Sequence, residues 1–289
     1  MISMAVITSA LELGFIYALV ALALFLSFRI LNIADMTTDG AFTLGCAVSA
    51  TVALAGHPWL ALPAAMIAGA AAGFVTAALQ TKFRIPSILA GIITNTGLYT
   101  VNLAVMGFSS NVNLLRTETI FSLLKESLGD GYKLIPALVI TMVVGGFLIF
   151  FLKTRVGLSV RATGDNADMV RASSINTAFT VTIGLMLSNS ITALSGAVLA
   201  QYQKTADINL GTGMVVIGLA SLIIGETVIR SKKLWAKALC AVVGCIVYRF
   251  IIAIALRLDL PSECLKLVSA AIVAVAIAMP TVRAKKGGK

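Results

Sequence analysis

Long apolar runs alternate with short polar breaks along almost the whole chain. Nine apolar segments lie near residues 4–28, 41–55, 59–80, 86–106, 134–152, 177–203, 212–229, 238–257 and 264–280. Most approach the ~20 apolar residues that a helix needs to cross the hydrocarbon core, whereas a membrane-spanning strand is about half as long and alternates in polarity. Helices also satisfy every backbone polar group inside lipid. The pattern predicts an all-α, polytopic transmembrane bundle of about nine segments, a single domain over residues 1–289.

The composition agrees with this class. Hydrophobic residues make up 59% of the 289 residues and charged residues only 12%, with a mean hydropathy of +1.00, while soluble domains carry about 25% charged residues. We therefore expect a multi-pass protein of the bacterial cell (inner) membrane, surrounded by the lipid bilayer. The formal net charge of +10 does not indicate a nucleic-acid partner, because the basic residues lie in short loops and the C-terminal tail.

The distribution of charge predicts the orientation. An excess of Lys and Arg marks cytoplasmic loops. Every second loop is basic, and the loops between them, such as 107–133, carry few or balanced charges. The basic stretches are Lys82 with Arg84, residues 153–176, residues 230–237 and residues 283–289. This alternation predicts an N-terminus outside and a C-terminus inside.

Two polar breaks interrupt the apolar pattern, at residues 32–43 and 205–213. Each follows a long apolar segment and precedes a shorter one, and each contains an Ala-Asp pair, Ala34-Asp35 and Ala206-Asp207. Because the segments before the two breaks cross the membrane in opposite directions, the breaks fit an inverted repeat with interrupted helices at corresponding places.

The acids in these breaks have two interpretations. Asp35, Asp39 and Asp207 can cap the short helices that follow, since carboxylates are favoured at helix N-termini, or they can contact a solute. Capping is the favoured interpretation.

Residues 153–176 (KTRVGLSVRATGDNADMVRASSIN) form a basic, polar segment between two apolar runs. We expect it to be cytoplasmic, with a short helix near 164–173 that docks a partner. Small or apolar contacts would come from Ala167, Met169, Val170 and Ala172, with Arg161, Asp165 and Arg171 at the rim. The alternative is an ordinary solvated loop.

Polar residues inside apolar segments are candidates for lining a translocation path, because burying them against lipid is costly. Asn95 and Asn102 are seven residues apart and share a helix face, and Asn189 lies in a second polar cluster, 188–195. The alternative is that these side chains bond neighbouring helices, at about 0.6 kcal/mol each.

The motifs in these segments resemble those of the permease subunits of ATP-binding-cassette importers of the branched-chain amino acid and ribose type. Similar stretches are Arg161-Ala162 with Asn166 and Ser174-Ile175-Asn176, residues 191–202 (ITALSGAVLAQY), and residues 213–225 (GMVVIGLASLIIG). Residues 30–45 and 87–107 look most similar to a subgroup that serves aromatic amino acid uptake. The break departs from the family's usual Asn-Phe-Ala-His with Asn32-Ile33-Ala34-Asp35.

The resemblance implies a type II importer-like fold and several partners. These are cytoplasmic ABC ATPase subunits that hold ATP and Mg²⁺, an extracellular or periplasmic substrate-binding (lipo)protein that docks on 107–133, and a second permease copy. Coupling to the ATPase would rest on Arg161, Ala162, Gly164, Asp165, Asn166, Ala167, Met169, Arg171 and Ala172. The translocation path would include Asn32, Asp35, Asp39, Asn95, Asn102, Asn189 and Asp207.

The sequence therefore predicts a permease subunit of an ATP-driven importer of aromatic or branched-chain amino acids. The chain has no G-x-x-x-x-G-K-[ST] phosphate loop, so ATP would be bound by another subunit. We expect no cofactor, metal or catalytic residue in this chain. Two other transport functions remain open: import of a sugar or nucleoside, and secondary ion-coupled transport, which would use Glu12 or Asp35. A membrane enzyme is disfavoured by the single histidine, His57, and the absence of an acid–base pair.

Overall fold

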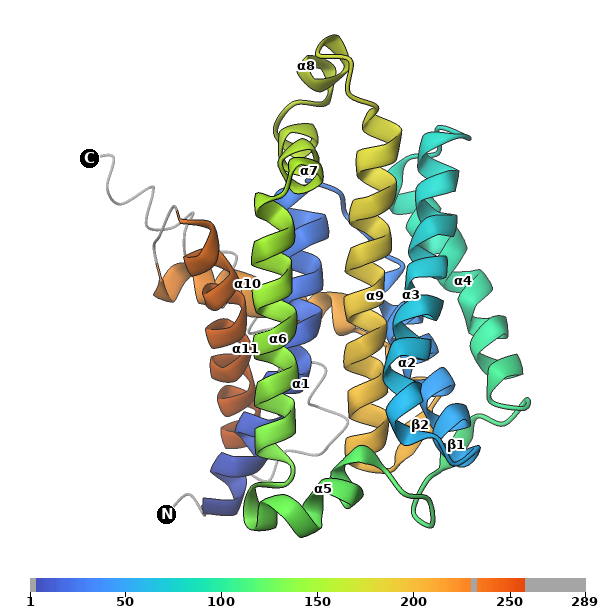
Figure 1. The fold of residues 1–289 in the computed structure, drawn as a ribbon, viewed down its shortest axis with the longest axis vertical. Coiled ribbons are helices and arrows are strands. Elements are labelled where there is room, and N and C mark those ends of the chain that lie inside the picture. Colours follow the sequence, from blue (N-terminus) through green and yellow to red (C-terminus); the bar gives the residue numbers. More distant parts are fainter. Residues whose placement is uncertain (1–3, 230–232, 258–289) are drawn as a thin grey trace.

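The computed structural model describes residues 4–229 and 233–257 as a bundle of apolar helices (Figure 1). Six helices in this part of the chain are long and apolar enough to cross a membrane, and two shorter apolar helices, Thr38–Leu54 and Met214–Val228, accompany them. They match eight of the nine predicted segments. The ninth, 264–280, and the basic tail lie outside the described residues.

The helices follow one another with few long connections. The described elements are α1 (Met4–Leu24), the π-helix η1 (Phe25–Ile30), α2 (Thr38–Leu54), α3 (Pro58–Thr81), α4 (Ser87–Val105), β1 (Asn111–Asn113), α5 (Ile120–Leu128), the 3₁₀ turn η2 (Gly129–Gly131), α6 (Leu134–Lys153), α7 (Arg155–Asp165), α8 (Ala167–Ala172), α9 (Thr177–Gln203), β2 (Thr205–Asp207), α10 (Met214–Val228) and α11 (Leu234–Arg257). β1 and β2 form a two-stranded antiparallel ribbon, with Val112 opposite Ala206.

Both predicted breaks are present, but the first is shorter than predicted: residues 32–37 are non-helical, whereas residues 38–43 already belong to α2. The first begins where η1 ends: Leu31 donates its backbone N–H to the Leu26 carbonyl and Ile33 to the Ser27 carbonyl. Asn32 then adopts a left-handed conformation, with φ of 56°, which asparagine tolerates better than most residues. The chain unwinds here and starts α2 at Thr38.

The helices of the two halves of the chain pack in the same way, but corresponding helices run in opposite directions. α1 packs against α10 and α11, α9 packs against α2 and α3, and the pairs α2–α3 and α10–α11 pack against each other. In Figure 1, α1 rises from the end that carries the N-terminus, while α9 descends toward that end. The correspondence of α1, α2 and α3 with α9, α10 and α11 is the arrangement that the inverted repeat predicts.

Small residues and hydroxyls hold α9 against its neighbours. A Cβ on Gly69 or Gly45 would meet the backbone of α9, so these glycines let α3 and α2 approach closely, as small residues do in membrane bundles. The Ser188 hydroxyl donates to the Ala23 carbonyl at 2.8 Å, and the Ser195 hydroxyl donates to the Ile16 carbonyl at 2.7 Å, both on α1. This part of the polar cluster 188–195 therefore bonds helix to helix.

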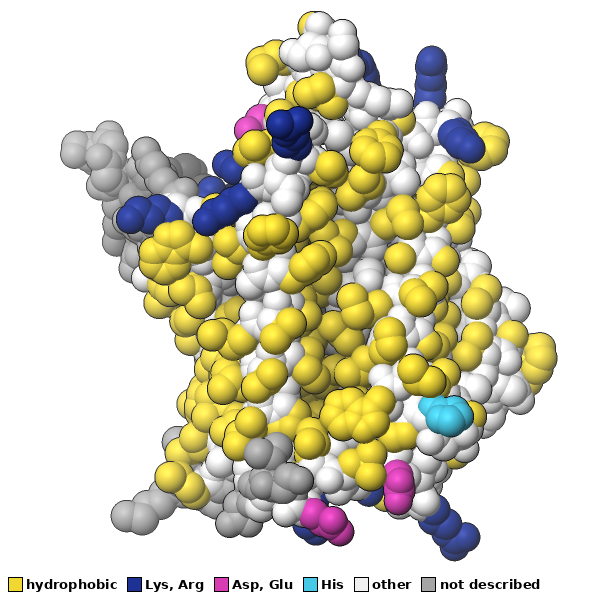
Figure 2. Space-filling model, viewed as in Figure 1, with side chains coloured by type: hydrophobic (Ala, Val, Ile, Leu, Met, Phe, Trp, Pro, Cys, Tyr) yellow, Lys and Arg dark blue, Asp and Glu magenta, His cyan; other side chains and the backbone are white. Residues whose placement is uncertain are grey.

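The two ends of the bundle differ in charge. The α3–α4 turn and α7–α8 lie at one end, and α5 with the β1–β2 ribbon lies at the other (Figure 1). Figure 2 shows a yellow apolar belt across the middle of the molecule, with dark blue Lys and Arg side chains more frequent above it than below it. The positive-inside rule assigns this upper end, which holds Lys82, Arg84 and residues 153–176, to the cytoplasm.

Candidate translocation site and coupling loop

The two short helices meet at Asp39, in the first turn of α2. Its Oδ2 accepts the backbone N–H of Gly213 and its Oδ1 accepts that of Val215, both at 2.9 Å. The Gly211 N–H next to this turn donates to the Thr43 hydroxyl at 3.1 Å. Asp39 therefore caps α10, in the other half of the molecule. The expectation that its side chain caps α2, the helix in whose first turn it lies, is wrong, because both carboxylate oxygens accept N–H groups at the start of α10.

Asp35 ties the first break to α9. Its Oδ1 accepts the Thr37 N–H at 2.9 Å, and its Oδ2 accepts a hydrogen from Asn189 Nδ2 at 2.7 Å. Both side chains are buried. Because a buried carboxylate without partners is costly, this pair fixes the position of the unwound segment against α9.

The two Ala-Asp pairs make the same local turn. Asp207 Oδ1 accepts the N–H of Asn209 at 2.8 Å, two residues on, as Asp35 Oδ1 does with Thr37. Such Asx turns replace a backbone hydrogen bond where the chain leaves regular structure. The match that suggested a repeat in the sequence thus corresponds to equivalent turns in the structure.

A polar cavity of about 280 Å³ lies between α2, α4 and the segment after β2. Its walls are formed by Asp39, Gly40, Thr43, Asn95, Thr96, Tyr99, Asn102, Ile208, Asn209 and Thr212. Asn102 is buried, donates to the Gly40 carbonyl at 3.1 Å, and its Oδ1 has no hydrogen-bond partner among the described residues. A buried amide oxygen without a protein partner is a hydrogen-bond acceptor left over for water.

The structure brings together three of the seven predicted path residues, Asp39, Asn95 and Asn102. The other four lie elsewhere: Asp35 is buried against Asn189 of α9, Asn32 is exposed beside η1, and Asp207 lies on β2. Sequence reasoning missed Tyr99, although Asn95, Tyr99 and Asn102 form an i, i+4, i+7 stripe on one helix face.

Residues 153–176 form two short helices where one was expected. Asn166 separates α7 from α8 and caps α8, since its Oδ1 accepts the N–H groups of Asp168 at 3.1 Å and Met169 at 3.0 Å. Asn176 caps α9 in the same way, through Ala178 and Phe179. Asn166 and Asn176, which belong to the stretches similar to importer permeases, thus set the helix boundaries of this segment.

The predicted coupling residues divide into three groups. Gly164 packs against the backbone of Ile30 in η1, where a side chain would not fit, and Arg161 and Ala162 are half-buried nearby. Ala167 and Arg171 line a groove of about 820 Å³ between α8, the end of α3 and the start of α9. Asp165, Asn166, Met169 and Ala172 are exposed, with Met169 63% exposed. Val170, also expected at the docking surface, is buried.

The outer loop 107–133 is fastened to the bundle by Gln201. Its Oε1 accepts the N–H of Ile120 at 2.9 Å, and its Nε2 donates to the Pro58 carbonyl at 3.1 Å and the Ser49 hydroxyl at 3.2 Å. The β1–β2 pairing holds the same loop to the end of α9. The loop is therefore an ordered cap over the outer end of the helices.

Comparison with known protein families identifies this architecture. The model of the branched-chain amino acid transport system / permease component family matches residues 6–278. This chain belongs to that family of ABC importer permeases. The resemblance drawn from the motifs is confirmed, as are the polytopic helical fold and the place in the bacterial inner membrane. A secondary transporter is excluded by the same finding.

Individual relatives are also transport permeases. The chain is 34% identical to a tyrosine transport system permease protein of Clostridioides difficile, over 92% of this chain and 88% of the relative. It is 27% identical to an inner membrane ABC transporter permease protein of Escherichia coli (75% and 73% covered) and 21% identical to a ribose import permease protein of Haemophilus influenzae (84% and 75% covered). No solved structure matches.

Proposed function

We propose that this permease imports an amino acid with an aromatic or branched side chain, and that the cavity of Asp39, Asn95 and Asn102 belongs to its translocation path. The substrate class is supported by the tyrosine permease relative, at 34% identity, against 21% for the ribose permease. A sugar or nucleoside substrate is the second candidate, supported by the more distant relatives.

The proposed path runs beside α4. Thr96, Tyr99 and Thr100 are exposed on this helix, whose other exposed residues carry no polar side-chain group. Polar groups facing lipid are unfavourable, so this side of α4 is expected to face a second permease copy or a water-filled passage. A homodimer would enclose the cavity between two α4 helices. An external binding protein would deliver the solute to the outer end, where 107–133 is held in place.

We propose that transport is driven by ATP hydrolysis in a pair of cytoplasmic ABC ATPase subunits, which hold ATP and Mg²⁺. The observation that carries this proposal is the position of α8, which projects beyond the bundle at the cytoplasmic end (Figure 1), while α7 is packed through Gly164 onto η1. A movement imposed on α8 would reach the first break through this contact. The exposed Met169 is the apolar anchor that we expect at the centre of the docking surface.

The decisive experiment alters this anchor in the complete transporter. Met169→Asp should abolish co-purification of the ATPase and substrate-stimulated ATP hydrolysis, because it places a charge in an apolar contact. Met169→Leu, which keeps an apolar side chain of similar size, should retain both. Full ATPase stoichiometry and stimulated hydrolysis in Met169→Asp would refute the docking assignment.

A further inference from the structure

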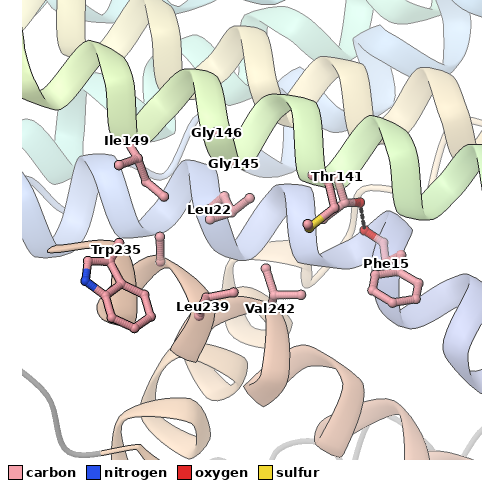
Figure 3. A pocket seen from close by; sticks show the side chains of 11 residues that line it. Phe15, Leu22, Thr141, Gly145, Gly146, Ile149, Trp235, Leu239 and Val242 are labelled. Carbon is pink, nitrogen blue, oxygen red and sulfur yellow. Dashed lines mark hydrogen bonds between the residues drawn. The ribbon is translucent and has the colours of Figure 1, made fainter. Parts of the chain in front are cut away.

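An apolar groove of about 220 Å³ opens on the membrane-facing surface between α1, α6 and α11. Figure 3 shows Trp235, Leu239 and Val242 of α11 facing Ile149 and Thr141 of α6, with Leu22 of α1 at the back. It lies away from the polar cavity, which is formed by α2, α4 and the segment after β2. The translocation path therefore does not account for it.

The groove exists because two adjacent glycines leave out side chains. Added to Gly146, a Cβ would meet nothing within 4 Å, and one added to Gly145 would meet only Leu22, at 3.7 Å. Val143 and Phe147, also on α6, are exposed apolar residues of ordinary size. The surface of α6 is thus hollowed at one place within a wall of larger side chains.

The chemistry of the lining excludes a polar occupant. Its side chains are apolar apart from Thr141 and the indole N–H of Trp235. The Thr141 hydroxyl already donates to the Phe15 carbonyl at 2.8 Å (Figure 3). The volume is also smaller than the ~300–1,000 Å³ of typical small-molecule sites. A flexible hydrocarbon chain fits such a groove, and acyl chains surround these helices in the bilayer.

The cytoplasmic end of the groove carries a positive charge. Lys153 follows Ile149 by four residues on α6 and therefore lies on the same helix face, one turn toward the cytoplasm. It is exposed and forms no ion pair with any described residue. Trp235, half exposed at the rim, is a residue type that prefers the headgroup level of a membrane.

We propose that this groove binds one acyl chain of an anionic phospholipid of the inner leaflet, with its headgroup at Lys153. The groove supplies the fit to the chain and the lysine supplies the preference for a negative headgroup. The bound lipid fills the gap between α6 and α11 and so connects α6 to the second half of the repeat.

Trp235 provides a direct probe, since the chain has only two tryptophans. In the full-length Trp59→Phe protein, reconstituted in mixed bilayers, Trp235 fluorescence is measured with brominated-chain phosphatidylglycerol or brominated-chain phosphatidylcholine. We expect phosphatidylglycerol to quench with about fivefold higher relative affinity, the effect of one lysine near an anionic headgroup. Equal quenching by the two lipids would overturn the proposal.

Two variants, each with a matched control, test the contact with the acyl chain and the contact with the headgroup separately. Gly146→Leu fills the groove and should abolish the preference, whereas Gly97→Leu, the same change in open space on α4, should keep it. Lys153 is exposed at the last residue of α6, so Lys153→Gln should leave the packing intact and reduce the preference to about one, while Lys82→Gln, at the same end of the molecule, should not. A preference that survives both Gly146→Leu and Lys153→Gln would also overturn the proposal.

Discussion

The carboxylate of Asp39 on α2 accepts the backbone N–H of Val215 on α10 at 2.9 Å, and a second N–H from Gly213. One half of the inverted repeat thus caps the short helix of the other half. The reverse contact is absent among the described residues, because Asp207 bonds within its own turn, to Asn209. The repeat is symmetric in helix packing and asymmetric in this polar contact, which borders the cavity.

Replacing Asp39 by Ala should destabilise the protein by about 2 kcal/mol, because two N–H groups at the start of α10 lose their acceptor. Asp39→Asn keeps one carbonyl oxygen and should cost less than half as much. Thermal unfolding of the purified protein in detergent measures both. Equal losses in the two variants would mean that charge, and not capping, is what Asp39 contributes. Asp207→Ala serves as the control, with little expected effect.

The buried pair of Asp35 and Asn189 should be energetically coupled. Asp35→Ala and Asn189→Ala each remove one partner of a 2.7 Å hydrogen bond and should destabilise by about 1–3 kcal/mol. The double variant should cost less than the sum, by about 1 kcal/mol or more, since the second change then removes a bond already lost. A double-mutant cycle of chemical unfolding in detergent measures this. Additive losses would show that the break is held by other contacts.

The helical bundle could be predicted from the sequence because its signals are local. Runs of apolar residues set the helices, and the Ala-Asp pairs marked two breaks that prove to be equivalent turns. The partners of buried polar groups could not be predicted in the same way. Whether Asp39 bonds α2 or α10 depends on how two segments about 170 residues apart are placed, which no local pattern contains. The same holds for Asn189, which packs against Asp35 and leaves the polar cavity to residues of α4.

The coupling loop shows a similar limit. Its polarity and its resemblance to the family indicated a cytoplasmic helix, but Gly164 packs against the end of η1 and Val170 is buried. A six-residue helix such as α8 has too few turns for a periodic pattern to reveal its buried face. Only the packing of α7 on η1 separates anchoring residues from exposed ones.

Because α3 packs closely on α9, replacing a glycine by alanine should have very different effects on stability at two positions. Gly69→Ala would bring a Cβ into the backbone of α9 at Asn189 and should destabilise the protein by about 1–3 kcal/mol. Gly97→Ala has nothing within 4 Å and should be neutral or slightly stabilising, since alanine favours helix by up to ~1 kcal/mol. Thermal unfolding midpoints of the two variants test this. Similar midpoints would contradict the α3–α9 contact.

Arg249 on α11 lies over the ring of Tyr17 on α1, with the guanidinium carbon 3.7 Å from the ring centroid. This contact places the arginine side chain inside the bundle. Tyr17→Phe keeps the ring and should change stability little, whereas Tyr17→Leu removes the cation–π contact and should cost about 2 kcal/mol. Unfolding of the two variants in detergent gives the comparison, and equal losses would assign the effect to the Tyr17 hydroxyl, which both variants lack.

Substitutions of Asn95 test whether the polar cavity belongs to the translocation path. Asn95→Leu has nearly the same volume and removes the amide from the cavity wall, so uptake by the complete transporter in proteoliposomes should fall about tenfold, as expected when a solute loses a hydrogen bond of ~1.4 kcal/mol on its way. Assembly with the ATPase should be unchanged. Asn95→Gln retains the amide and should preserve most of the uptake. Tyrosine, leucine and ribose are supplied in parallel with the cognate binding protein. If Asn95→Leu transports each of them at the original rate, the cavity between α2 and α4 does not lie on the path.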